Sequence, residues 1–168
     1  LLIDEAHQLF PRVNSMHSLA FSSREVDAAL EEGNDHLGKG LTRLAEVIQR
    51  IVPVSPKKEC QIDFPEELWN TIDSMLLEYE ESSVDLMERD ALKELVFQCY
   101  RWRAAKEWGD RERFVCTLED KAEEERVVRY VCVDSSSLIK EILDTYESSI
   151  SFSGTLSPLK LYQGLHGG

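Results

Sequence analysis

The chain has 168 residues, of which 42% are apolar, and a formal net charge of −13. This length fits about one domain with its own core, no signal segment opens the chain, and no apolar run approaches the ~20 residues that cross a bilayer. We therefore expect no membrane partner and a cytoplasmic protein, nucleoid-associated if bacterial. The negative charge argues against tight nucleic-acid binding by the chain alone, because that affinity depends on neutralising phosphates.

The chain opens with a short apolar run followed by two acids, LLIDEAHQL. Leu1 to Ile3 is typical of a buried parallel strand, and α/β sheets bind ligands at the carboxyl ends of such strands. There Asp4 would hold the Mg²⁺ of a nucleoside triphosphate through water, Glu5 would activate the attacking water, and His7 would sense the phosphate. Taken alone, the same pattern is more often a solvated acidic turn.

Two helices are predicted between residues 22 and 51, after a connector over residues 11–23. Ser22 and Glu25 form an S-x-x-E capping box, which opens a short helix that Gly33 ends. The second helix begins at His36, and two prolines stop it. Its apolar residues recur at spacings of three and four, as in an amphipathic helix: Leu37, Leu41, Leu44, Ile48 and Ile51.

Two longer helices are expected next. Asp63 and Glu66 form another capping box, and the helix that they open has an apolar stripe. A break at 82–83 precedes the longest segment, from about Val84 to Trp108, which would span ~37 Å if it were continuous. We interpret the stripe of the first of these helices as core: Leu68, Trp69, Ile72, Leu76 and Tyr79.

Cations and tryptophans alternate in the segment RWRAAKEWGDRER, residues 101–113. Such a mixture can grip single-stranded DNA through phosphate attraction and base stacking. The structural alternative, which we prefer, is a helix end at which the dipole favours cations and the tryptophans belong to the core. The candidate DNA contacts are Arg101, Trp102, Arg103, Lys106 and Trp108.

Acidic residues concentrate between positions 59 and 94, where twelve Asp and Glu face two cations. We interpret this stretch mainly as a solvated helix surface. The alternatives are a docking surface for a basic protein partner and a repulsive guide for DNA.

The pattern changes to strands after residue 112. Residues 113–118 and 126–133 alternate in the β manner, and the acidic turn EDKAEEE between them indicates a hairpin. A helix over 136–146 and a strand over 149–152 follow. The residues expected to share one face of each hairpin strand are Phe114, Cys116 and Leu118 in the first, and Val128, Tyr130 and Cys132 in the second.

The four cysteines, at positions 60, 99, 116 and 132, do not have the spacing of a metal site. No CxxC pair occurs, and no nearby histidine completes a zinc set. We interpret them as structural thiols, and a reducing cytoplasm disfavours a disulfide between Cys116 and Cys132.

A second motif follows the last predicted strand, within ISFSGTLSPLKLY at residues 150–162. LLIDEAHQL and SFSGTLSPL, in that order, resemble motifs II and III of the XPD/DinG-type superfamily-two DNA helicases, the iron–sulfur helicases. In that family a large helical insertion, the arch, lies between these two motifs of the first motor domain. The resemblance covers the layout of the whole chain, although only the two motifs match residue by residue.

The resemblance implies a fold that is mostly α with a small α/β remnant: a helical arch-type insertion on a partial parallel sheet, plus a β-hairpin. Residues 1–12 would be a motor-domain remnant with the DEAH box, and residues 13–111 the arch-like insertion. Residues 112–168 would be a second motor remnant with the hairpin, a helix and the SGTLSP motif. Leu1–Ile3 and Ser149–Phe152 should then be neighbouring parallel strands.

The resemblance also implies roles. Asp4 and Glu5 would serve Mg²⁺ binding and water activation, and His7 would couple the nucleotide state to movement. The parent would be an ATP-dependent DNA helicase in repair or replication, moving 5′ to 3′ on single-stranded or forked DNA. It would use ATP and Mg²⁺, and an iron–sulfur cluster if upstream cysteines exist. Coupling roles are also implied for Ser153, Gly154, Thr155 and Ser157.

The chain contains no GxxxxGK[ST] phosphate loop. We therefore expect it to be a piece of a longer helicase that, by itself, is inactive and binds no cofactor. An alternative stays open, in which the chain is an acidic helical protein-interaction module of a degenerate helicase-like protein.

Overall fold

The computed structural model describes residues 1–51, 59–107, 111–121 and 125–166. The fold is mostly α with a small α/β part, as expected, and no helix in these ranges is long and apolar enough to cross a membrane. The chain forms two compact units. The smaller comprises Leu1–Ser18, Glu112–Phe114 and Val131–Gly168, and the larger comprises Leu19–Arg111 and Val115–Tyr130. By packing, most of the hairpin therefore belongs to the helical unit, whereas the expected three-part division of the chain stays a prediction.

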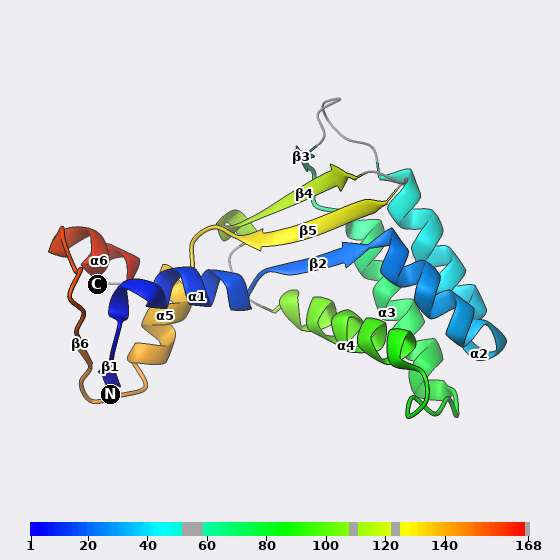
Figure 1. Cartoon of the computed structure of the whole chain (residues 1–168), viewed down its shortest axis with the longest axis horizontal. Helices are drawn as coiled ribbons and strands as arrows, with labels where there is room; N and C mark the ends of the chain where they lie inside the picture. Colours follow the sequence, from blue (N-terminus) through cyan, green and yellow to red (C-terminus); the bar gives the residue numbers. More distant parts are fainter. Residues whose placement is uncertain (52–58, 108–110, 122–124, 167–168) are drawn as a thin grey trace. The chain divides into compact units, whose positions relative to one another are not determined.

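The smaller unit is built around two short parallel strands (Figure 1). Strand β1 pairs with β6 in the register Leu2↔Ile150 and Ile3↔Ser151, which confirms the predicted pairing of the two ends of the chain. The helices of this unit include α5, whose N-cap is Ser135; the preceding residue, Asp134, accepts the Ser136 N–H at 2.9 Å. The elements are β1 (Leu2–Ile3), the 3₁₀ helix η1 (Ala6–Gln8), α1 (Leu9–Met16), α5 (Ser136–Leu143), β6 (Ile150–Ser151) and α6 (Leu159–Leu165).

The larger unit contains a four-stranded sheet with strand order β2-β5-β4-β3. The predicted hairpin is confirmed as β4 and β5, and its burial alternates as predicted. Two strands were not predicted: β2 lies in the expected connector and pairs antiparallel with β5, so that Leu19 lies opposite Tyr130, and β3 pairs with β4. The strands are β2 (Leu19–Ser22), β3 (Glu59–Ile62), β4 (Phe114–Asp120) and β5 (Arg126–Cys132).

Helix α2 (Ser23–Arg50) begins at the predicted capping box of Ser22 and Glu25. The predicted end at Gly33 is wrong, because the helix assignment continues for 28 residues. A straight helix of that length would span roughly 42 Å. However, Arg126 donates its N–H to Ser23 Oγ at 3.0 Å and its Nη1 to Gln49 O at 2.6 Å, so one arginine reaches both ends. Element α2 therefore doubles back on itself (Figure 1).

The reversal of α2 lies between Gly33 and Leu41. A Cβ on Gly33 would lie 3.0 Å from Cδ1 of Leu41, a residue that would be about 12 Å further along a straight helix. Glycine at this position thus permits the two limbs to approach closely. The two helices predicted from the sequence thus correspond to the two limbs of α2, although the helix does not end at Gly33.

Helices α3 (Glu66–Glu81) and α4 (Asp90–Ala105) differ from the predictions at their starts. The capping box at Asp63 is wrong, because Pro65 is the N-cap and makes no side-chain cap bond. The predicted start of α4 near Val84 is also wrong. There Ser82 Oγ accepts the Val84 N–H, and Asp85 Oδ1 accepts the Met87 N–H. Such local side-chain bonds compete with helix formation.

The core of the larger unit lies between the sheet and the helices (Figure 1) and is rich in aromatic rings. Trp69 of α3 and Trp102 of α4 are fully buried, with ring centroids 4.6 Å apart. Phe21 of β2 lies 5.4 Å from Trp102, and Tyr130 of β5 lies 5.1 Å from Trp69. The four cysteines are buried free thiols, and burial raises the pKa of Cys99. These facts confirm the core interpretation of the tryptophans at 69 and 102.

Candidate functional site

The two sequence motifs meet at the carboxyl ends of β1 and β6. The pairing continues beyond the strands, because Phe152 donates its N–H to Ile3 O at 3.0 Å and Ala6 donates its N–H to Phe152 O at 3.2 Å. Asp4 is therefore the first residue after β1 and Ser153 the second residue after β6, at the same edge of a parallel sheet. This edge is where α/β folds place their ligands.

Three side chains from the two motifs form one polar network. Nδ1 of His7 lies 2.7 Å from Ser153 Oγ and 3.1 Å from Glu5 Oε2. Ser153 Oγ donates to Glu5 Oε2 at 3.3 Å. Because a carboxylate only accepts hydrogen bonds, the proton of the imidazole belongs on Nδ1, which then donates towards Ser153. Thr155 extends the network, since its N–H donates to Ser153 Oγ at 3.3 Å.

The two acids differ in how they are held. Asp4 is exposed, and its Oδ1 accepts the N–H of Glu5 at 2.7 Å. Glu5 has a left-handed backbone with φ 50° and ψ 43°. Within the described residues, no three His, Cys, Asp or Glu side chains gather to hold a metal ion. The pair fits a Mg²⁺ that keeps most of its ligands from water and phosphate, which is the usual arrangement for that ion.

Two of the predicted coupling residues lie outside this network. A Cβ on Gly154 would meet nothing within 4 Å. Ser157 is exposed, and its N–H donates to Thr155 O at 2.9 Å. The structure thus brings Glu5, His7 and Ser153 together and leaves these two residues in the outer part of the turn.

His166 is a contact of this site that the sequence gave no reason to expect. Its Nε2 lies 3.2 Å from the carbonyl oxygen of Ala6, the residue between Glu5 and His7. It follows α6 in an unremarkable QGLHGG stretch. No spacing or motif connects it to Ala6, which lies 160 residues earlier in the chain.

The basic segment of α4 is largely engaged within the larger unit. Trp102 is fully buried, so its ring is not available for base stacking. Arg103 pairs with Glu80 at 3.0 Å, and Lys106 pairs with Asp73. This arrangement matches the structural alternative for the segment. Arg101 is exposed, and Trp108 lies outside the described residues.

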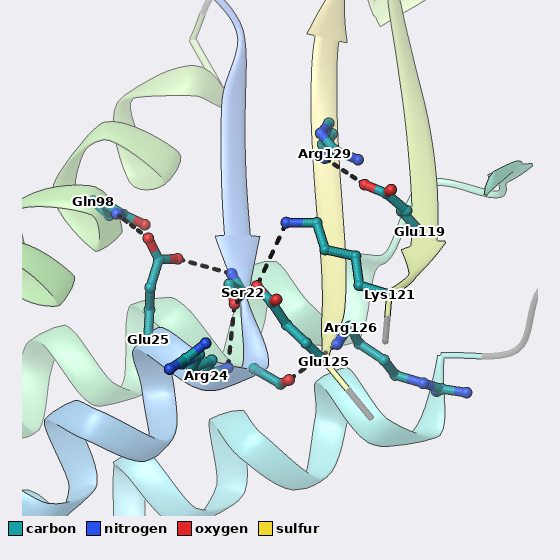
Figure 2. A network of polar contacts seen from close by, with 10 residues as sticks. Ser22, Arg24, Glu25, Gln98, Glu119, Lys121, Glu125, Arg126 and Arg129 are labelled. Carbon is teal, nitrogen blue, oxygen red and sulfur yellow. Dashed lines mark hydrogen bonds and ion pairs between the residues drawn. The ribbon is translucent and has the colours of Figure 1, made fainter. Parts of the chain in front are cut away.

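A polar groove of about 430 Å³ lies on the larger unit beside the start of α2 (Figure 2). Its charges largely satisfy one another: Ser22 Oγ donates to Glu125 at 2.7 Å, and Arg129 pairs with Glu119 at 2.6 Å. The hydroxyl of Ser22 holds the pKa of Glu125 below its ordinary value. We interpret this groove as a structural junction between the first turn of α2 and the hairpin.

Comparison with known proteins gives the fold. No protein-family profile matches the chain, and no curated protein matches it. A solved structure titled XPD helicase matches 99% of this chain and 29% of its own chain, with a TM-score of 0.59 and 19% sequence identity. The present chain thus spans less than a third of the length of that protein. At this identity the likeness concerns the fold alone, and the chain has the fold of the matched part of that structure.

Proposed function

We propose that the chain is part of an ATP-dependent DNA helicase of the XPD/DinG type and that the end of β1 and β6 is half of its ATP-hydrolysis site. One observation carries the proposal: Glu5 and His7 share a hydrogen-bonded network with Ser153, 148 and 146 residues away in the chain. The helicase-like fold supports it. Nucleotide motors need such a junction, because hydrolysis must be linked to movement.

In this proposal Asp4 orients the Mg²⁺ of bound ATP through water, and Glu5 accepts a proton from the attacking water. Ser153 and His7 hold the Glu5 carboxylate in place. A change at the phosphate would therefore move the residues that follow β1 and those that follow β6 together. Thr155 passes that change to the turn that ends in Ser157. The rest of the ATP site comes from parts of the protein outside these residues.

The larger unit would be the arch-like insertion, acting on single-stranded or forked DNA during repair or replication, with 5′ to 3′ movement. The candidate DNA contacts stay Arg101, Arg103, Lys106 and Trp108, whereas the fully buried ring of Trp102 is not available for base stacking. An iron–sulfur cluster does not fit the cysteines of this chain, which are buried free thiols on β3, α4, β4 and β5. The proposal therefore assigns no step to a cluster.

The test uses the full-length protein. Glu5→Gln should keep ATP binding and lower the hydrolysis rate by about 10²- to 10⁴-fold, because only the water-activating group is lost. Glu141→Gln, an exposed acid of α5, is the matched control and should hydrolyse ATP like the wild type. Hydrolysis that survives Glu5→Gln unchanged would contradict the assignment.

A second candidate is an acidic protein-interaction module of a degenerate helicase. Met87, 82% exposed, lies on a loop between Asp85 and Glu88, which is a surface suited to a basic, partly apolar protein segment. A full-length protein that binds no ATP would favour this candidate over the first.

A further inference from the structure

Glu5 has an unusual backbone for a catalytic acid. In the described part of the chain it is the one non-glycine residue with positive φ. A side chain in this region is crowded against its own carbonyl, so the conformation persists only where neighbouring contacts fix it. The turn at Glu5 redirects the chain from β1 into η1, and it sets where the carboxylate points.

Four hydrogen bonds fix the backbone around this turn. Two are local: the Glu5 N–H donates to Asp4 Oδ1 at 2.7 Å, and the Gln8 N–H donates to Glu5 O at 2.8 Å. A third joins the Ala6 N–H to Phe152 O of the neighbouring segment. The fourth joins the Ala6 carbonyl to His166 Nε2 at 3.2 Å and comes from a side chain. Because Ala6 is fully buried, water does not reach this carbonyl while His166 is in place.

We propose that His166 is a positioning residue for Glu5: it donates its Nε2–H to the Ala6 carbonyl and so holds the left-handed turn that aims the Glu5 carboxylate at Ser153. The expected effect of His166 on catalysis rests on the proposed ATP hydrolysis, whereas its expected effect on the turn at Glu5 does not. His166 is itself held at the end of α6, where its N–H donates to Tyr162 O at 3.0 Å and its ring lies 6.3 Å from the Tyr162 ring.

The hydrogen bond from His166 to the Ala6 carbonyl decides which variants should keep the contact and which should lose it. A carbonyl oxygen only accepts, so His166 must carry a proton on Nε2. The amide nitrogen of glutamine is as many bonds from Cα as Nε2 of histidine, whereas the amide nitrogen of asparagine corresponds to Nδ1. His166→Gln should therefore keep the bond, and His166→Asn and His166→Ala should lose it.

The first readout is steady-state ATP hydrolysis by the full-length protein. His166→Ala and His166→Asn should lower kcat by about 10- to 100-fold, the range expected when a reacting group is displaced by about 1 Å, with little change in KM for ATP. His166→Gln should restore most of the rate. Gln163→Ala, an exposed change on the same helix, should leave kcat unaltered.

The second readout is amide hydrogen exchange over residues 4–8 of the same proteins without nucleotide. Exchange at Ala6 and Gln8 should be faster in His166→Ala and return to the wild-type rate in His166→Gln. A wild-type protein that hydrolyses no ATP would defeat the proposed function, and this readout would still decide the role of His166. Unchanged exchange in His166→Ala, unchanged kcat despite faster exchange, or equal rescue by Asn and Gln would each overturn the inference.

Discussion

The larger unit and the smaller unit are each stabilised by different interactions. In the larger, Trp69 and Trp102 are fully buried in an aromatic core. In the smaller, the strands that carry the candidate site leave Leu2 71% and Ile150 60% exposed, although parallel sheets are normally covered on both faces. These exposed strands are held by main-chain bonds and a few polar side chains, and the apolar core of this unit, with Val13 and Ile139, contains no tryptophan. The comparison teaches that the candidate site lies in the unit without the aromatic core.

The largest difference between the two units should appear when an aromatic ring of the core is removed. Trp102→Ala should lower the free energy of unfolding by about 3–5 kcal/mol, because a large side chain leaves a cavity among packed rings. Ile150→Ala, on the exposed face of β6, should change it by less than about 0.5 kcal/mol. Denaturant unfolding followed by tyrosine and tryptophan fluorescence measures both. Similar losses for the two variants would contradict the contrast.

Substitutions of glycine by alanine should also change the stability of the two units differently, but by less. A Cβ on Gly40 of α2 would lie 2.7 Å from Glu78 Oε2 and 3.2 Å from Met75 Cβ. The carboxylate can move away, but the Met75 Cβ cannot, so Gly40→Ala should cost roughly 1–2 kcal/mol net of the better helix propensity of alanine.

Gly164 of α6 is the matched control in the smaller unit, because a Cβ there would meet nothing within 4 Å. Gly164→Ala should be neutral or stabilising by up to about 1 kcal/mol. Thermal unfolding compares the two variants, and a stabilising Gly40→Ala would mean that α2 and α3 are packed less closely than described.

The smallest expected effect is the acid response of the polar groove. The Ser22 hydroxyl lowers the pKa of Glu125 from its ordinary 4.5. A lowered carboxyl pKa contributes stability that is fully present above the ordinary value and is lost as the pH falls through the folded value. Stability should therefore decline below about pH 4.5, and Glu125→Gln should reduce the slope. Unfolding midpoints measured from about pH 6 to pH 3 test this, and an unaltered slope in the variant would be the contrary result.

Features that repeat along the chain could be predicted from the sequence. The apolar stripe at 37–48 and the alternation in β4 and β5 reflect burial on one side, so they are visible as periodicity. Strands β2 and β3 have four residues each, too few for alternation to be evident. The late start of α4 depends on Ser82 and Asp85 bonding to nearby amides, a competition that composition does not reveal.

The candidate site also has one part that could be predicted from the sequence and another part that could not. The pairing of two strands 148 residues apart followed from the resemblance to two helicase motifs, and the parallel pairing of β1 with β6 confirms it. The roles of the individual site residues stay predictions. The His166 contact could not be foreseen, because a single side chain meeting a main-chain carbonyl leaves no pattern in the sequence.

The pairing of β2 with β5 has a mechanical consequence. The chain first enters the larger unit at Leu19 and finally leaves it at Tyr130, and these two residues lie directly opposite each other at the end of an antiparallel ladder. A pulling force applied at these two residues would break the hydrogen bonds of that ladder one after another from this end, because the bonds of an antiparallel pair run perpendicular to the strands. Tension along the chain would therefore act first on the pair of Leu19 and Tyr130, so the aromatic core would be loaded through the Tyr130 ring, which lies 5.1 Å from that of Trp69.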